Sequence, residues 1–297
     1  MVYIKTKEEI AVMREGGKIL ARILHNLAKE IEPGATTGYL EELAFKWITE
    51  AGGKPAFKGY KQGAGAKGFP TSICTSINNE VVHGPALPSR KLDEGDLISI
   101  DIGMEYPACA KAPARSRPEW PGRSAGKPLM VTTAPNPPRN KYSKDGGFIT
   151  DMALTAGVGK IGKEQEKLLK ATREALELGI RQVRPNNRLS DIGRAIETHV
   201  SRHGFSVVRQ LVGHGVGYEV HEDPQIPNFV PREKGFKDLI LKPGMVIAIE
   251  PMVNAGRFEV EGEADGFTIY TKDGSLSAHF EHTVAVTEKG FEILTLL

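Results

Sequence analysis

An aspartate inside an apolar strand is the feature that most constrains this chain. Residues 97–103 read LISIDIG, and this apolar, isoleucine-rich run predicts a buried strand that carries Asp101. A buried carboxylate is costly unless it is paired or holds a metal ion. Residues 244–250, GMVIAIE, repeat the pattern of residues 95–101, GDLISID, and put Glu250 in the place of Asp101. A carboxylate bonded to backbone amides at a strand end would explain one strand, but the repeat favours a site.

Length and composition bound the class of protein. The chain has 297 residues, of which 40% are hydrophobic and 26% charged, as in an ordinary globular protein. The net charge of +2 gives no reason to expect specific nucleic-acid binding or membrane association. The two cysteines are far apart, no apolar signal sequence opens the chain, and no run approaches the roughly 18 apolar residues of a membrane span. We therefore expect a reduced, cytoplasmic protein.

Apolar residues at helical spacing predict two pairs of helices. The predicted helices run from a capping box at Thr6 to Pro33, over the following stretch to Gly52, from about Gly162 to Pro185, and from a cap at Ser190 to Gly204. In each half of the chain a helix pair is followed by a Glu-Val-(Val)-His stretch and then by a carboxylate strand. This order predicts two similar halves that face each other across a pseudo-twofold axis, with a site where they meet.

One segment does not fit this pattern. Residues 107–144 contain eight prolines and eight Lys or Arg against one acid, Glu119, and they show no sustained helical or strand period. Such a composition predicts a long loop or disordered insertion. A basic loop that contacts RNA is the alternative.

Two further strands carry a carboxylate of their own. Residues 146–154 contain Asp151, and residues 278–286 contain Glu281. The first of these can pair antiparallel with the Asp101 strand, so that the insertion forms the tip of a hairpin. Four converging carboxylates repel one another, and no Lys or Arg lies in these four strands to compensate them. Two divalent cations would balance the charge.

A histidine between glycines supplies a different type of ligand. His214 stands in GHGVG at 213–217, and HEDP follows at 221–224. Flanking glycines let an imidazole approach a crowded centre, although a lone histidine of this kind is more often found in a turn. Imidazole together with carboxylates suits Mn, Fe, Co or Zn, and the lack of thiolates argues against a structural zinc knot.

These residues resemble, in order and local context, the methionine aminopeptidases. The resemblance rests on TSIN at 75–78 with HG at 83–84, GHGVG, HEDP, IEPM at 249–252 and EHT at 281–283, and it covers nearly the whole chain outside residues 107–144. It is closest to the type I, bacterial form, because no large insertion separates His221 from Glu250. It implies one α+β catalytic domain over residues 1–297. The fold it implies is the pita-bread (creatinase/aminopeptidase) fold, a pseudo-twofold antiparallel sheet flanked by helices.

The resemblance also implies a role for each site residue. Asp151 and Glu281 would bridge two divalent metal ions, Asp101 would hold one ion, and His214 with Glu250 would hold the other. Glu250 would shuttle a proton as well. His83 and His221 would stabilise the tetrahedral intermediate and position the scissile amide. The residues that match the methionine pocket are Tyr60, Phe69, Cys74 and Phe267.

The implied function is removal of the initiator methionine from nascent proteins in the cytoplasm by a monomeric enzyme. Its partners would be nascent polypeptide N-termini, with the ribosome as a further candidate. Two alternatives stay open. A prolidase or X-Pro aminopeptidase of the same fold usually carries an extra N-terminal domain. A non-catalytic binding homologue would be expected to have lost metal ligands.

Overall fold

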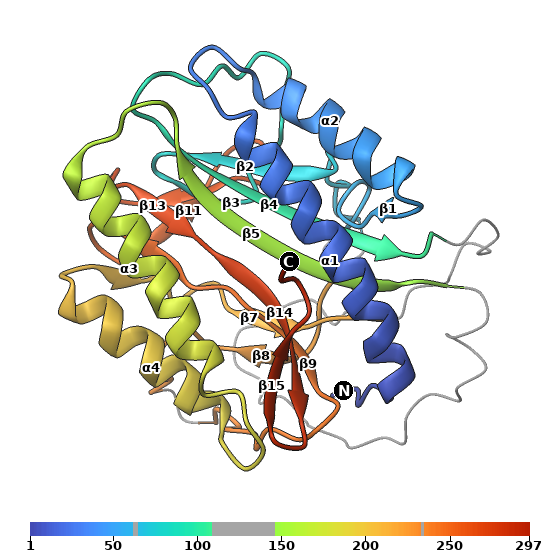
Figure 1. Ribbon diagram of the computed structural model, residues 1–297. Coiled ribbons are helices and arrows are strands. Elements are labelled where there is room, and N and C mark those ends of the chain that lie inside the picture. Colours follow the sequence, from blue (N-terminus) through green and yellow to red (C-terminus); the bar gives the residue numbers. More distant parts are fainter. Residues whose placement is uncertain (62–64, 109–145, 233–234) are drawn as a thin grey trace.

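The structure, a computed structural model, describes residues 1–61, 65–108, 146–232 and 235–297. The predicted insertion at 107–144 lies outside these residues except for its first two positions, so the prediction of a loop there stays a prediction. A nine-stranded sheet organises the rest, in the order β1-β4-β5-β14-β9-β7-β8, with β2 on β4 and β15 on β14 (Figure 1). Two three-stranded sheets, β13-β10-β6 and β11-β12-β3, adjoin it.

The elements have the following bounds. The helices are α1 Lys7–Lys29, α2 Thr37–Glu50, α3 Lys163–Ile180 and α4 Leu189–Arg202. The strands of the first half are β1 Lys54–Pro55, β2 Ile73–Ile77, β3 Glu80–Val82, β4 Leu97–Tyr106 and β5 Phe148–Gly157. The strands of the second half are β6 Ser206–Val207, β7 Gly213–Gly215, β8 Glu222–Ile226, β9 Val246–Ile249, β10 Met252–Asn254, β11 Val260–Gly262, β12 Ile269–Thr271, β13 Ser277–His279, β14 Glu281–Thr287 and β15 Gly290–Ile293.

The four predicted helices are present, and the caps of two of them test the sequence signals. Thr6 caps α1 through the predicted capping box, in which its side chain accepts from the Glu9 amide. Ser190 does not cap α4, so that prediction was wrong. Arg188 is the N-cap, and Ser190 lies in the first turn, where its hydroxyl donates to Asp238 at 2.7 Å. Among the described residues, no helix has both the length and the apolar content needed to cross a membrane.

The predicted hairpin of the Asp101 strand is present. β4 and β5 pair antiparallel without interruption from Leu97 opposite Gly157 to Tyr106 opposite Phe148. This register places Asp101 opposite Ala153 and Gly103 opposite Asp151. A long ladder of this kind holds both carboxylates in place, whatever the length of chain that joins the strands.

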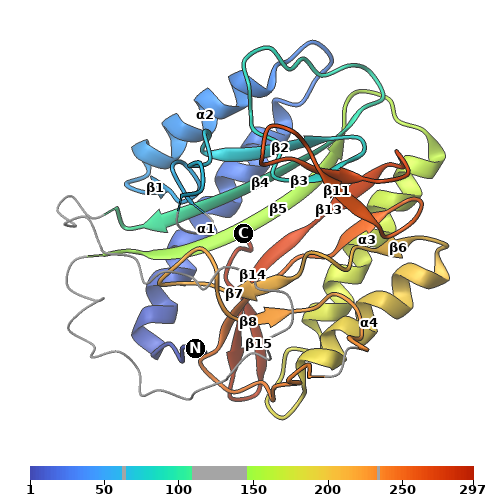
Figure 2. The same ribbon diagram turned by 180° about the vertical axis from the view of Figure 1, so that it is seen from behind.

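The two halves meet at the centre of the sheet. There β5 of the first half pairs with β14 of the second, with Ala153 opposite Glu281. One apolar core packs α1 and α2 on the first half, around residues such as Leu24 and Ile100, and another packs α3 and α4 on the second half, around residues such as Ile196 and Ile247. The helices cover one face of the sheet, and the view from behind shows the strands in front of them (Figure 2). The helices leave the opposite face of the sheet open for a functional site.

The stretch predicted as one strand at 278–286 is divided in two. Phe280 separates β13, which pairs with β10, from β14, which pairs with β9 and β5. Alternating apolar residues cannot reveal such a break, because both pieces are buried and keep the same period. The break places Glu281 at the first position of β14.

Candidate metal centre

The five predicted ligands come from five segments of the sheet. Asp101 lies on β4, Asp151 on β5, His214 on β7 and Glu281 on β14, while Glu250 directly follows β9. Asp101 and Glu281 both lie opposite Ala153, and Asp151 stands two residues before Ala153, which puts it on the same face of β5. The register of the sheet therefore brings together residues that are up to 180 positions apart.

Distances confirm that these side chains converge. One donor atom each of Asp151, His214 and Glu281 lie within 4.8 Å of one another. His214 Nε2 lies 3.4 Å from Glu250 Oε1. The carboxyl groups of Asp101 and Asp151 lie close enough to influence each other's pKa values, which adds the fifth residue to the cluster.

Burial and mutual repulsion make the charged form of these carboxylates unfavourable unless cations compensate them. Burial raises the pKa of Asp101 to about 7. Burial, followed by the negative charge of neighbouring carboxylates, raises the pKa values of Asp151, Glu250 and Glu281 well above their ordinary range. The imidazole of His214 does not offset this charge, because burial lowers its pKa to about 4 and keeps it neutral.

Buried carboxylate oxygens without a hydrogen-bond partner also favour a metal site. Asp101 Oδ1 and Glu281 Oε1 are buried and have no hydrogen-bond partner among the described residues. Buried carboxylate oxygens are normally bonded, and an orphan needs an explanation such as an ion that the oxygen would ligate. Carboxylate oxygens with one imidazole are a donor set for divalent transition metals. The cluster therefore fits a metal centre.

Glycines let the strands of the site approach closely. A Cβ on Gly213 would lie 2.4 Å from the Ala248 carbonyl oxygen of β9, and one on Gly215 would lie 2.3 Å from the Asp223 carbonyl oxygen. Only glycine fits in these places, so the two residues fix the strand that presents His214. The sequence suggested a different reason for these glycines, namely room for the histidine ring.

A threonine joins the two halves beside the ligands. Thr283 Oγ1 accepts from the Asp151 amide at 2.9 Å and donates to the Asp151 carbonyl at 2.8 Å. Thr283 is fully buried. These two hydrogen bonds tie the backbone of β5 to β14 at the place where each strand carries a carboxylate.

His221 lies beside the metal cluster. Its ring is perpendicular to that of His214, with 4.5 Å between the centroids. Its Nδ1 is hydrogen-bonded to the Tyr60 hydroxyl at 2.7 Å. Tyr60 thus fixes the orientation of His221, a contact that the sequence did not predict.

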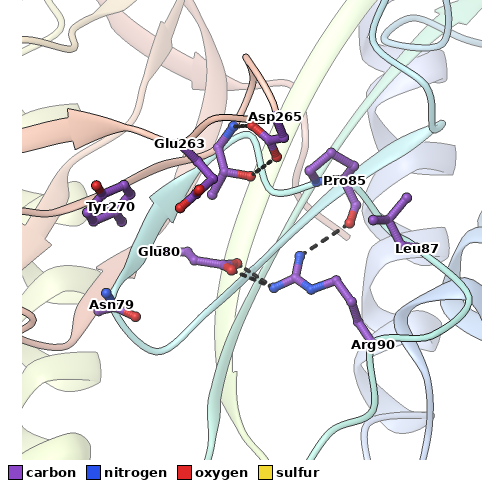
Figure 3. A pocket seen from close by; sticks show the side chains of 9 residues that line it. Asn79, Glu80, Pro85, Leu87, Arg90, Glu263, Asp265 and Tyr270 are labelled. Carbon is purple, nitrogen blue, oxygen red and sulfur yellow. Dashed lines mark hydrogen bonds and ion pairs between the residues drawn. The ribbon is translucent and has the colours of Figure 1, made fainter.

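His83 lies at the start of the loop that follows β3. Its backbone has a φ of 62°. Burial is the main cause that lowers the pKa values of His214 and His279, and the charge of His83 lowers both further, so the three rings share one environment. Arg90 ties the loop together, because it binds both carboxylate oxygens of Glu80, at 2.6 and 2.7 Å, and the Pro85 carbonyl at 3.2 Å (Figure 3).

That ion pair also lines a surface pocket of about 480 Å³ between β3 and β12 (Figure 3). None of the five candidate ligands lines this pocket. The pocket is therefore separate from the carboxylate cluster.

The four residues matched to the substrate pocket lie in one apolar cluster, together with Val220. The rings of Phe69 and Phe267 meet edge to face with centroids 5.5 Å apart. Cys74 lies opposite Asp101 across β2 and β4, so the two side chains are cross-strand neighbours. The structure thus places this cluster next to the candidate metal ligands.

His279 is the site residue that the sequence did not single out. Its ring is 1% exposed, with Nε2 3.6 Å from Glu250 Oε2 and 3.9 Å from Glu281 Oε2. Neither ring nitrogen has a hydrogen-bond partner among the described residues. The signal was available, because His279 stands two residues before Glu281 and alternation along a strand places such residues on the same face.

Comparisons with known proteins agree with this geometry. The sequence model of metallopeptidase family M24 matches residues 11–112 and 142–288. The chain belongs to this family. The match spans all five candidate ligands and is interrupted within the predicted insertion.

Curated relatives match this chain over nearly their whole length. Methionine aminopeptidase 1 of Bacillus subtilis is 44% identical over 296 residues, which is 99% of both chains. The methionine aminopeptidase of Clostridium perfringens is 42% identical over the full length of both chains.

Solved structures share the pita-bread fold. The crystal structure of methionine aminopeptidase from Rickettsia prowazekii superposes with a TM-score of 0.81 at 34% identity and full coverage of both chains. A prolidase from Pyrococcus horikoshii gives a TM-score of 0.67 at 18% identity, and the match covers 99% of this chain but 63% of the prolidase. The prolidase shows only that the fold is shared.

Proposed function

We propose that this M24 member is a metal-dependent aminopeptidase that removes N-terminal methionine from newly made polypeptides. The observation that carries the proposal is the convergence of four carboxylates and His214 in a chain whose full-length relatives are methionine aminopeptidases. A prolidase activity is disfavoured, because the prolidase match is confined to a part of that longer chain at 18% identity.

The cluster would hold two divalent ions, drawn from Mn, Fe, Co or Zn. Asp151 and Glu281 would contact both ions, Asp101 would complete one position, and His214 with Glu250 would complete the other. Such ions make water acidic enough to serve as a nucleophile at neutral pH, and they polarise a carbonyl group.

The chain's own residues supply the proton transfer and the orientation. Glu250 is the candidate proton shuttle, because its own bond to a metal ion would position it beside the activated water. His221 would position the scissile amide and His83 would stabilise charge on the carbonyl oxygen. Tyr60 would act through His221 as a positioning residue, since it is bonded to Nδ1.

The apolar cluster beside the ligands would bind the methionine side chain. Phe69 and Phe267 offer ring edges and faces, which suit a thioether. Tyr60 and Cys74 would complete the pocket, and the metal ligands would receive the substrate's amino end.

The substrates proposed are nascent polypeptide N-termini, which places the protein in the cytoplasm. The ribosome is a candidate partner, and a monomer is the proposed state. A non-catalytic homologue of the fold is the competing class, and it is separated from the enzyme by metal-dependent turnover.

A peptide panel tests the function. Metal-stripped protein supplied with Mn²⁺, Co²⁺, Fe²⁺ or Zn²⁺ should release methionine from Met-Ala-Ser but not from Met-Lys peptides, measured by chromatography of the products. Faster hydrolysis of Gly-Pro would favour the prolidase reading. Absence of cleavage with every metal would leave a binding homologue.

Replacement of one ligand supplies the control within the chain. Glu281→Ala removes a carboxylate proposed to contact both ions, so turnover should fall by more than about 100-fold, the upper range for loss of groups that support a metal site. Glu42→Ala, an exposed change on α2, should retain wild-type rates. Equal rates for both variants would contradict the assignment of Glu281.

A further inference from the structure

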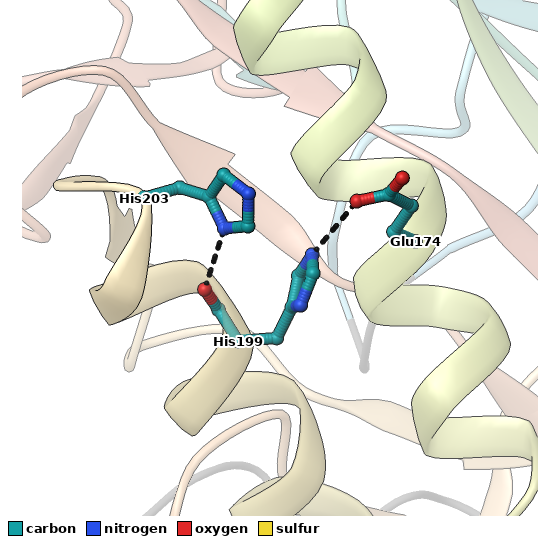
Figure 4. A group of neighbouring side chains, drawn as sticks. All are labelled: Glu174, His199 and His203. Carbon is teal, nitrogen blue, oxygen red and sulfur yellow. Dashed lines mark hydrogen bonds and ion pairs between the residues drawn. The ribbon is translucent and has the colours of Figure 1, made fainter.

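Two histidines and a glutamate form a second cluster on the outer helices. Glu174 lies on α3, His199 on α4, and His203 is the C-cap of α4 (Figure 4). One donor atom from each lie within 4.8 Å of one another. This cluster shares no residue with the candidate metal centre, and none of its members has a part in the proposed function.

His203 has the hydrogen-bonding pattern of a metal ligand. Its Nδ1 lies 3.0 Å from the carbonyl oxygen of His199 and donates to it (Figure 4). This bond fixes the tautomer in which Nε2 carries the lone pair. Histidines that bind metal ions nearly always donate their other ring nitrogen to a carbonyl or a carboxylate in this way.

His199 and Glu174 face each other across α3 and α4. Nε2 of His199 is buried and lies 3.2 Å from Glu174 Oε2 in an ion-pair contact (Figure 4), and its geometry does not satisfy this nitrogen with a full hydrogen bond. Burial, followed by the charge of His203, lowers the pKa of His199, whereas Glu174 raises it. A shared metal ion would satisfy both ligand atoms.

The spacing fits a metal ion with small side-chain movements. Donors at about 2.0–2.1 Å from a tetrahedral ion lie roughly 3.3 Å apart. The His199–Glu174 pair already has this separation. His199 and His203 are four residues apart on a helix, with ring centroids 4.4 Å apart, the spacing by which helices present two imidazoles to one ion.

The surrounding charges leave the carboxylate available. Lys170 Nζ approaches the other oxygen of Glu174 only to 3.9 Å, and the lysine side chain is 69% exposed. Its bond is therefore weak and screened by solvent.

We propose that Glu174, His199 and His203 form a second, peripheral site for a divalent transition ion such as Zn²⁺. Solvent would complete the coordination, because three protein ligands leave a fourth position. The ion would join α3 to the end of α4 and stabilise the pair of helices that covers the second half of the sheet.

Zn²⁺ titration of the metal-stripped full-length protein tests this site. Isothermal titration calorimetry is done on a background that combines Asp151→Asn, His214→Gln and Glu281→Gln, which removes three of the five ligands of the catalytic centre, and it should still show one equivalent of bound Zn²⁺. Adding His203→Gln should abolish that equivalent, and adding Glu174→Gln should weaken it by at least tenfold. Thermal unfolding should show a Zn²⁺-dependent rise in Tm that His203→Gln removes.

A matched histidine controls for loss of a ring. His25 on α1 also donates Nδ1 to the carbonyl four residues before it, Ala21, at 2.7 Å, so His25→Gln should leave the equivalent intact. Circular dichroism of the metal-free variants confirms that each is folded. If His203→Gln and His25→Gln bind the same amount of Zn²⁺, the proposal is wrong and the cluster is an ordinary His–Glu contact. Failure here would leave the proposed peptidase function untouched.

Discussion

At the scale of single residues, His279 lies beside the candidate ligands without being one of the five. Its buried ring faces Glu250 and Glu281 and has no hydrogen bond among the described residues. Its backbone is fixed, because Thr155 Oγ1 accepts from its amide and donates to its carbonyl, both at 2.8 Å. We therefore expect His279 to bond a carboxylate when that carboxylate turns to bind a metal ion.

Replacing His279 by leucine tests that role. His279→Leu keeps the volume but removes the ring nitrogens, so metal affinity should fall by about 10-fold to 100-fold, as for other groups behind metal ligands. His279→Gln retains a donor and should keep affinity close to wild type. Mn²⁺ binding followed by electron paramagnetic resonance measures this without reference to turnover, and equal affinity for all three proteins would contradict it.

Tyr60 allows a second test at this scale. Tyr60→Phe removes the hydrogen bond to His221 Nδ1, which is worth about 0.5–1.5 kcal/mol, so kcat should fall roughly 2-fold to 12-fold while KM changes little. Tyr39→Phe, an exposed change that also removes a hydroxyl bond, is the matched control. A change confined to KM would mean that Tyr60 serves the pocket alone.

At the scale of elements, the short strand β7 depends on its glycines. β7 has three residues, of which two are glycines in contact with carbonyl oxygens of neighbouring strands. Its pairing with β9 places His214 opposite Ala248, two residues before Glu250. The strand can present the imidazole only because its neighbours approach so closely.

Gly215→Ala should therefore disrupt the site. The new Cβ would lie 2.3 Å from a backbone oxygen, which forces β7 and β8 apart, so the free energy of unfolding should drop by about 2–4 kcal/mol and metal binding should weaken. Gly262→Ala on β11 meets nothing within 4 Å and should change stability by less than about 0.5 kcal/mol. Urea denaturation compares the two, and similar losses would refute the close-approach argument.

The whole molecule concentrates negative charge where its two halves meet. Each half brings two carboxylates to the junction of β5 and β14, and each has its own apolar core behind them. Folding without metal thus works against repulsion and burial at the centre of the sheet. Bound metal ions would compensate this negative charge and would link the two halves, because both halves supply ligands.

This arrangement predicts how the stability of the metal-free protein depends on pH. Because they are buried, His83, His214 and His279 have pKa values of about 3 to 4 when folded, against an ordinary value of 6.5, so between pH 6.5 and 8.0 they bind more protons when unfolded and add stability as the pH rises. Asp101 has a pKa of about 7 when folded, against an ordinary value of 3.8, so at this group the folded state binds more protons than the unfolded state in this range. The stability from this group is present at low pH and is lost as the pH rises through about 7.

Urea unfolding at pH 6.5 and 8.0 measures this effect. Between these values the chelator-treated wild type should lose stability relative to chelator-treated Asp101→Asn, which has the same histidines but no titrating carboxyl group at this position. In the Mn²⁺-loaded wild type this relative loss should be absent, because metal binding keeps its ligands deprotonated. An equal change of stability in both metal-free proteins would contradict the raised pKa of Asp101.

Much of the fold and of the site was predictable from the sequence, because local rules fix periodicity. The Thr6 capping box, the β4–β5 hairpin and the order of helices and carboxylate strands all follow from short patterns, and the structure bears them out. The Ser190 cap failed, because Asp238, 48 positions away, takes both the amide and the hydroxyl of that serine. Contacts across such a distance have no local signal.

The sequence by itself determined which residues are too costly to bury alone: Asp101, Asp151, Glu250 and Glu281 in apolar strands that lack a basic partner. Only the tertiary structure decided that these strands meet in one sheet, that Tyr60 bonds His221, and that His279 faces the site across the break at Phe280. The reason is physical. A burial pattern can be predicted from neighbouring residues in the sequence. Strand register and side-chain direction depend on which distant strands pair with each other.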